Sequence, residues 1–115
     1  MSVRRILSLK RASIRSRIDA VAAKEAALTQ RIASLNGQSD GLGVGEAGSD
    51  FQVAAMTMSR ARAIAVRLDA QRTKLRAQRT GLARELLSLD VADRTLADEE
   101  AKAARLAASR AADRA

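Results

Sequence analysis

The chain has no cysteine, histidine, proline, tryptophan or tyrosine, and its one aromatic residue is Phe51. Without cysteine, disulfides and thiolate metal sites are excluded, and without histidine the usual imidazole ligand and general base are missing. No uninterrupted apolar run approaches the roughly 20 residues that span a bilayer. The N-terminal apolar stretch is also too short for a secretory signal. We therefore expect a soluble, uncleaved protein suited to a reducing cytosol, with no catalytic residues, metal site or cofactor.

The 115 residues form at most one domain, with 21 Lys and Arg against 13 Asp and Glu, for a formal net charge of +8. Hydrophobic residues make up 47%, but alanine dominates them, so little side-chain volume is available to fill a thick globular core. A charge of this sign and size indicates an anionic partner, which could be nucleic acid, a phospholipid surface or an acidic protein. Charge by itself does not choose among these three.

The one obvious break in the chain is rich in glycine. Five of the six glycines lie between Gly37 and Gly48, and glycine loses more backbone entropy in a helix than any other residue. The pattern predicts a flexible loop over residues 36–50. Asn36 and Gly37 are expected to end the helix before it, because both tolerate the left-handed conformation that closes a last turn.

Two helices are predicted around this loop, over about residues 3–35 and 51–112, the second opened by a capping box of Ser49 and Gln52. Both carry an apolar row at a strict seven-residue interval, which we call the leucine row. It comprises Leu7, Ile14, Val21, Leu28 and Leu35, then Ala54, Ala61, Leu68, Leu75, Leu82, Leu89, Leu96 and Ala103. In the first helix a neighbouring mixed row comprises Arg4, Arg11, Ile18, Glu25 and Ile32. A sustained heptad repeat is typical of a coiled coil.

The predicted fold is therefore all-α, a single antiparallel two-helix coiled-coil hairpin over residues 1–115 with a longer second helix. A hairpin centred near Gly43 places residue i opposite residue 86 minus i, so the paired residues are Leu28 with Met58, Val21 with Ala65 and Leu7 with Arg79. Roughly the last thirty residues then have no helix to pack on. As an alternative, a break at Gly81 lets the remainder fold back as a third helix.

Basic residues gather in two stretches. The first 24 residues hold seven bases and one acid, and residues 60–84 hold eight bases and one acid. The predicted register sets these stretches side by side, and a surface of one sign favours an acidic partner. The candidate partner-binding residues are Arg11, Arg17, Arg60, Arg67, Arg72, Arg76 and Arg79. Between Glu85 and Glu100 the sign reverses and acids predominate.

Three apolar residues stand where the second helix leaves the loop: Phe51, Met56 and Met58. They either pack against Leu28, Ile32 and Leu35 and close the hairpin, or form a docking patch at its tip, because methionine adapts to irregular partners.

Two patterns that suggest chemistry have simpler interpretations. Residues 41–45 read Gly-Leu-Gly-Val-Gly but follow a helix and lack the ending of a phosphate-binding loop. Residues 98–100 are three consecutive acids, but neighbouring helical residues point in different directions, so they do not form a metal site.

The basic opening over residues 6–14, the heptads from Leu68 to Leu96 and the Ala/Arg/Glu-rich ending over residues 98–111 resemble the flagellar and type III export stalk family (FliJ-like). Nearly the whole chain takes part in this resemblance, although its first helix is shorter and its loop richer in glycine. Members of the family are small cytoplasmic helical hairpins. They insert into the export ATPase ring and contact the membrane export gate and export chaperones.

The resemblance implies a non-enzymatic stalk or adaptor of a bacterial export apparatus, cytoplasmic and peripheral at the inner membrane. The basic surface fits such a role, because arginines can meet carboxylates of an acidic ring. The chief alternative is a basic coiled coil that binds nucleic acid, although no aromatic side chain is available for base stacking. An amphipathic helix lying on anionic lipid and a self-associating coiled coil are further alternatives.

Overall fold

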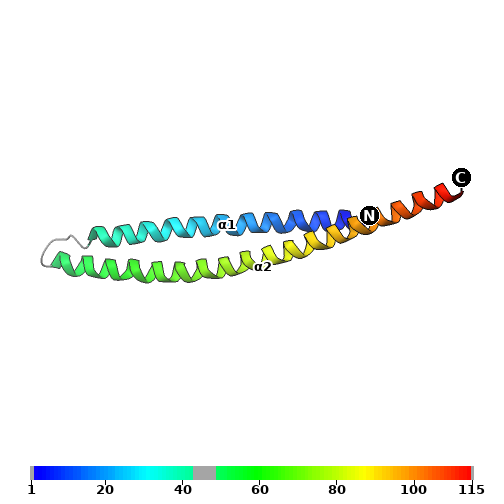
Figure 1. Ribbon diagram of the computed structural model, residues 1–115. Coiled ribbons are helices and arrows are strands. Elements are labelled where there is room, and N and C mark those ends of the chain that lie inside the picture. Colours follow the sequence, from blue (N-terminus) through cyan, green and yellow to red (C-terminus); the bar gives the residue numbers. More distant parts are fainter. Residues whose placement is uncertain (1, 43–48, 115) are drawn as a thin grey trace. The chain divides into compact units, whose positions relative to one another are not determined.

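The computed structural model describes residues 2–42 and 49–114, with side chains over 2–38 and 51–114. It contains two α-helices, α1 (Val3–Leu42) and α2 (Ser49–Arg114), and no strand among the described residues. The helices run antiparallel and pack against each other (Figure 1). This confirms the predicted helical hairpin with a longer second helix.

The first helix begins where the sequence predicts and ends later. The Ser2 hydroxyl accepts a hydrogen bond from the backbone N–H of Arg5 at 3.2 Å and so caps α1. At the other end α1 continues to Leu42, so the predicted stop at Asn36 and Gly37 is wrong. A glycine inside a helix costs only about 1 kcal/mol relative to alanine. At Gly37 nothing lies within 4 Å of the position that a Cβ would occupy, so the glycine is not required by close packing.

The second helix is continuous through Gly81, and the alternative with a third helix is therefore wrong. It starts two residues before the predicted position and ends two residues after it. The side chain of Ser49 lies outside the described residues, so the proposed capping box stays a prediction. The predicted loop over residues 36–50 is wrong for residues 36–42 and 49–50, which are helical, and its residues 43–48 lie outside the described part of the chain.

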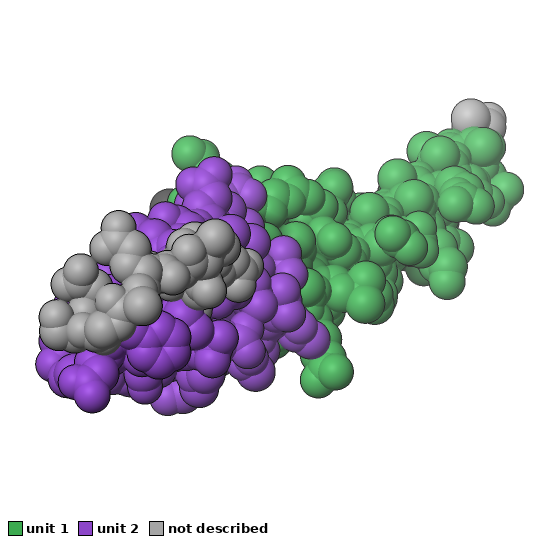
Figure 2. Space-filling view, turned by 90° about the vertical axis from the view of Figure 1, so that its left-hand side faces the viewer, with its two compact units in different colours: residues 1–18, 81–115 green, residues 19–80 purple. Residues whose placement is uncertain are grey.

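The chain divides into two units, drawn in different colours in Figure 2. Unit 1 comprises residues 1–18 and 81–115, and unit 2 comprises residues 19–80. Each unit therefore contains one stretch of α1 and one stretch of α2, packed along a seam.

The buried and half-buried residues from Leu7 to Leu35 follow the two predicted rows of α1, with Ala22 as the one exception. In α2, burial and the ion pairs of Arg79 and Glu100 reveal a second mixed row beside the leucine row, at the same interval: Met58, Ala65, Arg72, Arg79, Leu86, Asp93 and Glu100. The best-buried apolar side chains are Ile14 in unit 1 and Ala61, Ala65 and Leu68 in unit 2. None of the described side chains is completely buried, as expected for a two-helix seam.

The pairing register differs from the predicted one. In unit 2, Arg79 contacts Glu25 and Arg72 contacts Thr29, so the paired residue numbers add to between 101 and 104. In unit 1 they add to between 97 and 104. The predicted sum of 86 is therefore wrong. That prediction took the centre of the loop as the centre of the hairpin. In the structure, charged residues of α1 within the seam instead contact residues of opposite sign further along α2.

The observed register also gives the first part of the last thirty residues a packing partner. Leu86, Leu89, Asp93 and Leu96 of α2 are half-buried, and Asp93 contacts the first turns of α1 within unit 1. From Asp98 onward, every described residue is exposed. The prediction that the whole segment lacks a packing partner is therefore wrong for its first part.

Candidate functional site

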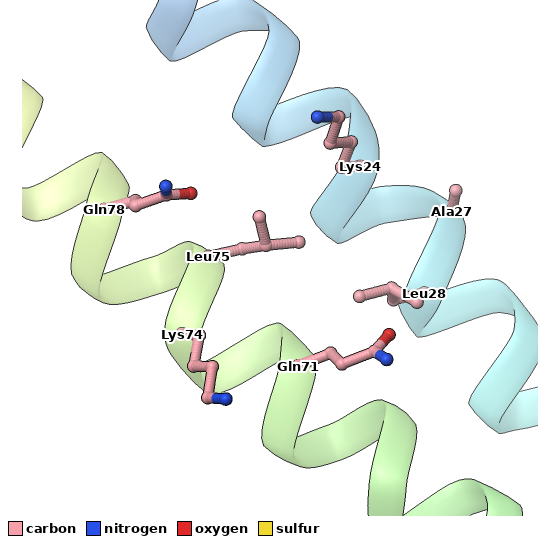
Figure 3. Close-up of a pocket in the computed structure, with 7 residues that line it drawn as sticks. All are labelled: Lys24, Ala27, Leu28, Gln71, Lys74, Leu75 and Gln78. Atoms are coloured by element: carbon pink, nitrogen blue, oxygen red, sulfur yellow. The ribbon is translucent and has the colours of Figure 1, made fainter.

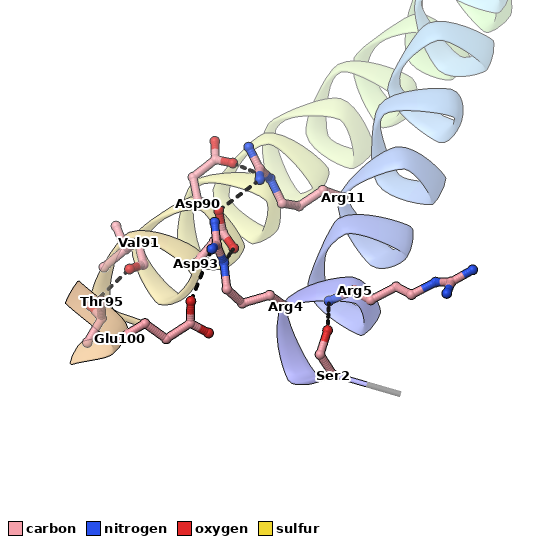
Figure 4. Close-up of polar contacts among 9 residues, drawn as sticks. All are labelled: Ser2, Arg4, Arg5, Arg11, Asp90, Val91, Asp93, Thr95 and Glu100. Carbon is pink, nitrogen blue, oxygen red and sulfur yellow. Dashed lines mark hydrogen bonds and ion pairs between the residues drawn. The ribbon is translucent and has the colours of Figure 1, made fainter. Parts of the chain in front are cut away.

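A cluster of ion pairs joins the two helices of unit 1 (Figure 4). Asp93 lies at its centre. Its two carboxylate oxygens accept hydrogen bonds at 3.3 Å, one from Nε of Arg4 and one from an Nη of Arg11. Arg4 also donates to Glu100 at 3.2 Å. The Nε of Arg11 lies 2.6 Å from Oδ1 of Asp90, as an ion pair whose orientation is not that of a hydrogen bond.

These contacts stabilise the charged form of Arg4. Its pKa is raised above its usual value, first by the hydrogen bond to Asp93 and then by the hydrogen bond to Glu100. An arginine is protonated at ordinary pH without such partners, so the contacts leave its charge unchanged. Arg11 and Asp93 are each about a quarter exposed, and an ion pair that is partly shielded from water is screened by salt less than one at the surface.

Unit 2 contains a smaller set of polar contacts across its seam. Glu25 is only 8% exposed, and its Oε2 lies 3.3 Å from an Nη of Arg79. Its Oε1 has no hydrogen-bond partner among the described residues. Arg72 forms an ion pair with Asp69 and donates a hydrogen bond to the Thr29 hydroxyl at 3.2 Å.

The predicted juxtaposition of the two basic stretches is wrong for the beginning of the first stretch. The ion pairs of unit 1 show Arg4 and Arg11, from that stretch, beside acids of the 85–100 segment. Opposite signs therefore meet in unit 1, whereas Lys24 of the first stretch and Lys74 of the second line the same hollow of unit 2.

The seven candidate partner-binding arginines consequently fall into two groups. Arg11, Arg72 and Arg79 lie in the mixed rows and form ion pairs within the chain. The other four are exposed and form no ion pair with any described residue: Arg17, Arg60, Arg67 and Arg76. Only the second group is available to a partner without breaking a contact of the hairpin.

The two rows occupy opposite faces of each helix pair. In an antiparallel coiled coil, equivalent heptad positions of the two helices lie on the same side of the seam. All the ion pairs between the helices involve mixed-row residues. Leu28 and Leu75, by contrast, line one hollow of unit 2, and Ile14 and Leu89 line one hollow of unit 1. Each unit thus has a mixed face and a leucine face.

A hollow of about 630 Å³ lies on the leucine face of unit 2. Figure 3 shows Leu28 and Leu75 pointing into the space between the two helices. The other lining residues are Lys24, Ala27, Gln71, Lys74 and Gln78. An apolar floor with cationic and amide side chains at the edges can hold an apolar segment that carries negative charge.

Two smaller hollows differ from this one in the charges that line them. The one on the leucine face of unit 1 measures about 280 Å³, and Lys10 and Arg17 face Glu85 in it. The one on the mixed face of unit 2 measures about 390 Å³ and includes both Arg62 and Asp69. Each of these two is lined by charges of both signs, whereas the hollow beside Leu28 and Leu75 is lined only by positive ones.

The apolar residues at the start of α2 do not close the hairpin as one prediction had it. Phe51 is 62% exposed and Met56 is 58% exposed, while Met58 is half-buried. The prediction that Phe51 and Met56 pack on Leu28, Ile32 and Leu35 is therefore wrong. In the observed register, those three residues lie opposite later turns of α2. A docking role for Phe51, Met56 and Met58 stays a prediction.

Sequence reasoning missed Glu25, Asp93 and Lys74. The signal for the first two was present in the mixed rows, where basic positions of one helix match acidic positions of the other at a single register. Lys74 belonged to a basic stretch, but its place beside an apolar hollow depends on that register.

Neither described helix contains a stretch long and apolar enough to cross a membrane. Among the described residues there is also no group of three or more side chains suited to hold a metal ion.

Comparisons with protein-family models, with curated proteins and with solved structures give no match.

Proposed function

We propose that this protein is a non-enzymatic coiled-coil adaptor that binds an acidic protein through exposed bases of unit 2. The observation that carries the proposal is the separation of its arginines into two groups. Arg72 and Arg79 are held in contacts across the seam or along α2. Arg60, Arg67 and Arg76 of the same helix are exposed. Exposed charge of one sign steers an oppositely charged partner and raises its association rate.

On the resemblance, the proposed partners are the export ATPase ring, the membrane export gate and the export chaperones of a flagellar or type III apparatus. The protein would then act in the cytoplasm, peripheral at the inner membrane. The hairpin supports this proposal through its fold, and the exposed arginines support it through their charge. The mechanism would be mechanical and electrostatic, with arginines meeting carboxylates of the ring.

A capture experiment with the full chain tests this proposal, using an export ATPase subunit as bait. The double variant Arg60→Glu/Arg67→Glu should lose capture while its helical circular dichroism persists. The matched control is Arg105→Glu/Arg110→Glu, which makes the same charge change on the exposed end of α2 and should be captured like the wild type. Capture that survives in the first variant contradicts the electrostatic mechanism.

The nucleic-acid alternative is tested by titrating the protein with duplex DNA over a series of salt concentrations. Neutralising phosphates releases counterions, so a true DNA-binding protein shows an affinity that falls steeply with salt. We expect no saturable binding at physiological salt. Tight binding with a steep salt dependence would replace the protein partner with nucleic acid.

A further inference from the structure

The leucine face of unit 2 has the features of a docking groove. Its floor includes Leu28 and Leu75, which are half-buried although they belong to the apolar seam. The hollow between them measures about 630 Å³. The two helices leave this apolar floor partly exposed. Covering it with a further apolar surface is favourable by about 25 cal/mol for each Å² of apolar surface removed from water.

The charges along the edges of this groove are all positive. On α1 the heptad positions beside the leucine row carry Lys24 and Arg31. On α2 the positions directly before the leucine row carry Arg60, Arg67 and Lys74 at seven-residue intervals, and Lys74 lines the hollow itself. All five side chains are exposed. The acids of unit 2 whose side chains are described are Asp19, Glu25 and Asp69, and none of them occupies an edge position.

We propose that this groove binds an acidic amphipathic α-helix of a partner protein, which lies along the hairpin as a third helix. The inference rests on the proposed function and names its binding surface and the chemistry of its partner. The distance from Arg60 to Lys74 is fourteen residues along α2, or about 21 Å. A partner helix of about four turns would therefore follow the whole basic edge.

Charge complementarity distinguishes this occupant from a second copy of the chain. Two copies that joined through their leucine faces would bring basic edges together, and like charges facing each other across an interface are costly. A helix with leucines on one side and glutamates flanking them places apolar side chains on the floor and carboxylates beside Lys24, Arg67 and Lys74. Such a helix matches both features of the groove.

The test uses a fluorescent synthetic peptide of about four helical turns, with leucines at heptad spacing and glutamates beside them. Its anisotropy is measured with the full-length protein. Two control peptides carry lysine for glutamate or serine for leucine. We expect binding of the first peptide, and neither control peptide should bind.

Two matched variants locate the binding site. Arg67→Glu/Lys74→Glu reverses two charges at the edge of the groove, and Arg62→Glu/Arg84→Glu makes the same change in net charge at positions away from the leucine row. All four residues are exposed. The first variant should weaken binding of the peptide by roughly tenfold or more. The second should weaken binding by much less, because a surface charge acts most strongly on a partner next to it. Leu75→Gln should also weaken binding of the peptide, and circular dichroism checks that this variant keeps its helicity.

The outcomes separate this inference from the proposed function. If both double variants weaken the peptide equally, an acidic partner still binds but the groove is not its site, and the inference is overturned. If the wild type binds neither the acidic peptide nor the ATPase subunit, both proposals are wrong. A wild-type dimer in sedimentation that Leu75→Gln dissolves would show that a second copy occupies the groove, which also overturns the inference.

Discussion

Charged residues within the seam are paired by sign. Arg11 of the mixed row in α1 meets Asp93 of the mixed row in α2, and Glu25 meets Arg79. A charged residue at a seam position weakens a coiled coil relative to an apolar one, but it also selects the register in which its partner is present. Each of these residues therefore acts on the specificity of pairing more than on its strength.

A charge swap tests this role at Glu25. Arg79→Glu places two carboxylates together in a partly buried site, and we expect it to lower the free energy of unfolding by about 1 to 3 kcal/mol. The double variant Glu25→Arg/Arg79→Glu should recover most of that loss. Urea denaturation followed by circular dichroism measures both. If the second substitution adds to the loss instead of reversing it, the two side chains do not interact.

Asp93 gives a second prediction at this scale, because it accepts hydrogen bonds from two arginines. Asp93→Ala should lower the free energy of unfolding by about 1 to 2 kcal/mol, since Arg11 would keep a partly buried charge with fewer partners. The control is Asp98→Ala, an exposed aspartate whose replacement should change stability by less than about 0.5 kcal/mol. Equal effects of the two substitutions in urea denaturation would be inconsistent with the cluster.

At the scale of the helices, the sequence predicted the two heptad rows of α1 and the leucine row of α2, because apolar periodicity is visible within a single helix. The register was not visible in the same way. It depends on matching the mixed row of α1 with that of α2. A slip of one heptad in one direction would leave Arg11 opposite Leu86, and in the other direction Arg4 opposite Ala107. The predicted centre at Gly43 used only the position of the loop.

The glycines show a related limit of sequence reasoning. A cluster of glycines predicts a break, but Gly37 lies inside α1 and Gly81 inside α2. Around Gly81, helix formers such as Leu82, Ala83 and Arg84 outweigh the cost of one glycine, whereas no comparable run of helix formers surrounds Gly37. Low helix propensity therefore predicts a weak point in a helix more reliably than it predicts an end.

Replacing these glycines tests the point. At Gly81 a Cβ would meet no atom within 4 Å, so Gly81→Ala should raise the free energy of unfolding by about 0.5 to 1 kcal/mol. Gly37→Ala should act in the same direction, for the same reason. Thermal unfolding by circular dichroism measures the change. A loss of stability in Gly81→Ala would show that the helix there is bent or interrupted in solution.

For the whole molecule, the arrangement of charges depends on one quantity, the antiparallel register. It brings acids of residues 85–100 to Arg4 and Arg11, leaves Arg60, Arg67 and Arg76 exposed, and places Lys74 beside the hollow lined by Leu28 and Leu75. Each part of the candidate site follows from it. The fold class was predictable from composition and heptads, but the division of the arginines into paired and exposed groups was not.

The register can be measured directly, because the chain has no cysteine and any introduced pair holds its only thiols. We compare Leu28→Cys/Leu75→Cys with Leu28→Cys/Met58→Cys in a glutathione redox buffer and measure the intrachain disulfide formed. The first pair should oxidise to a large extent and the second only slightly. Loop closure alone favours the second pair, which is closer in sequence. Preferential oxidation of the second pair would contradict the register and the groove that depends on it.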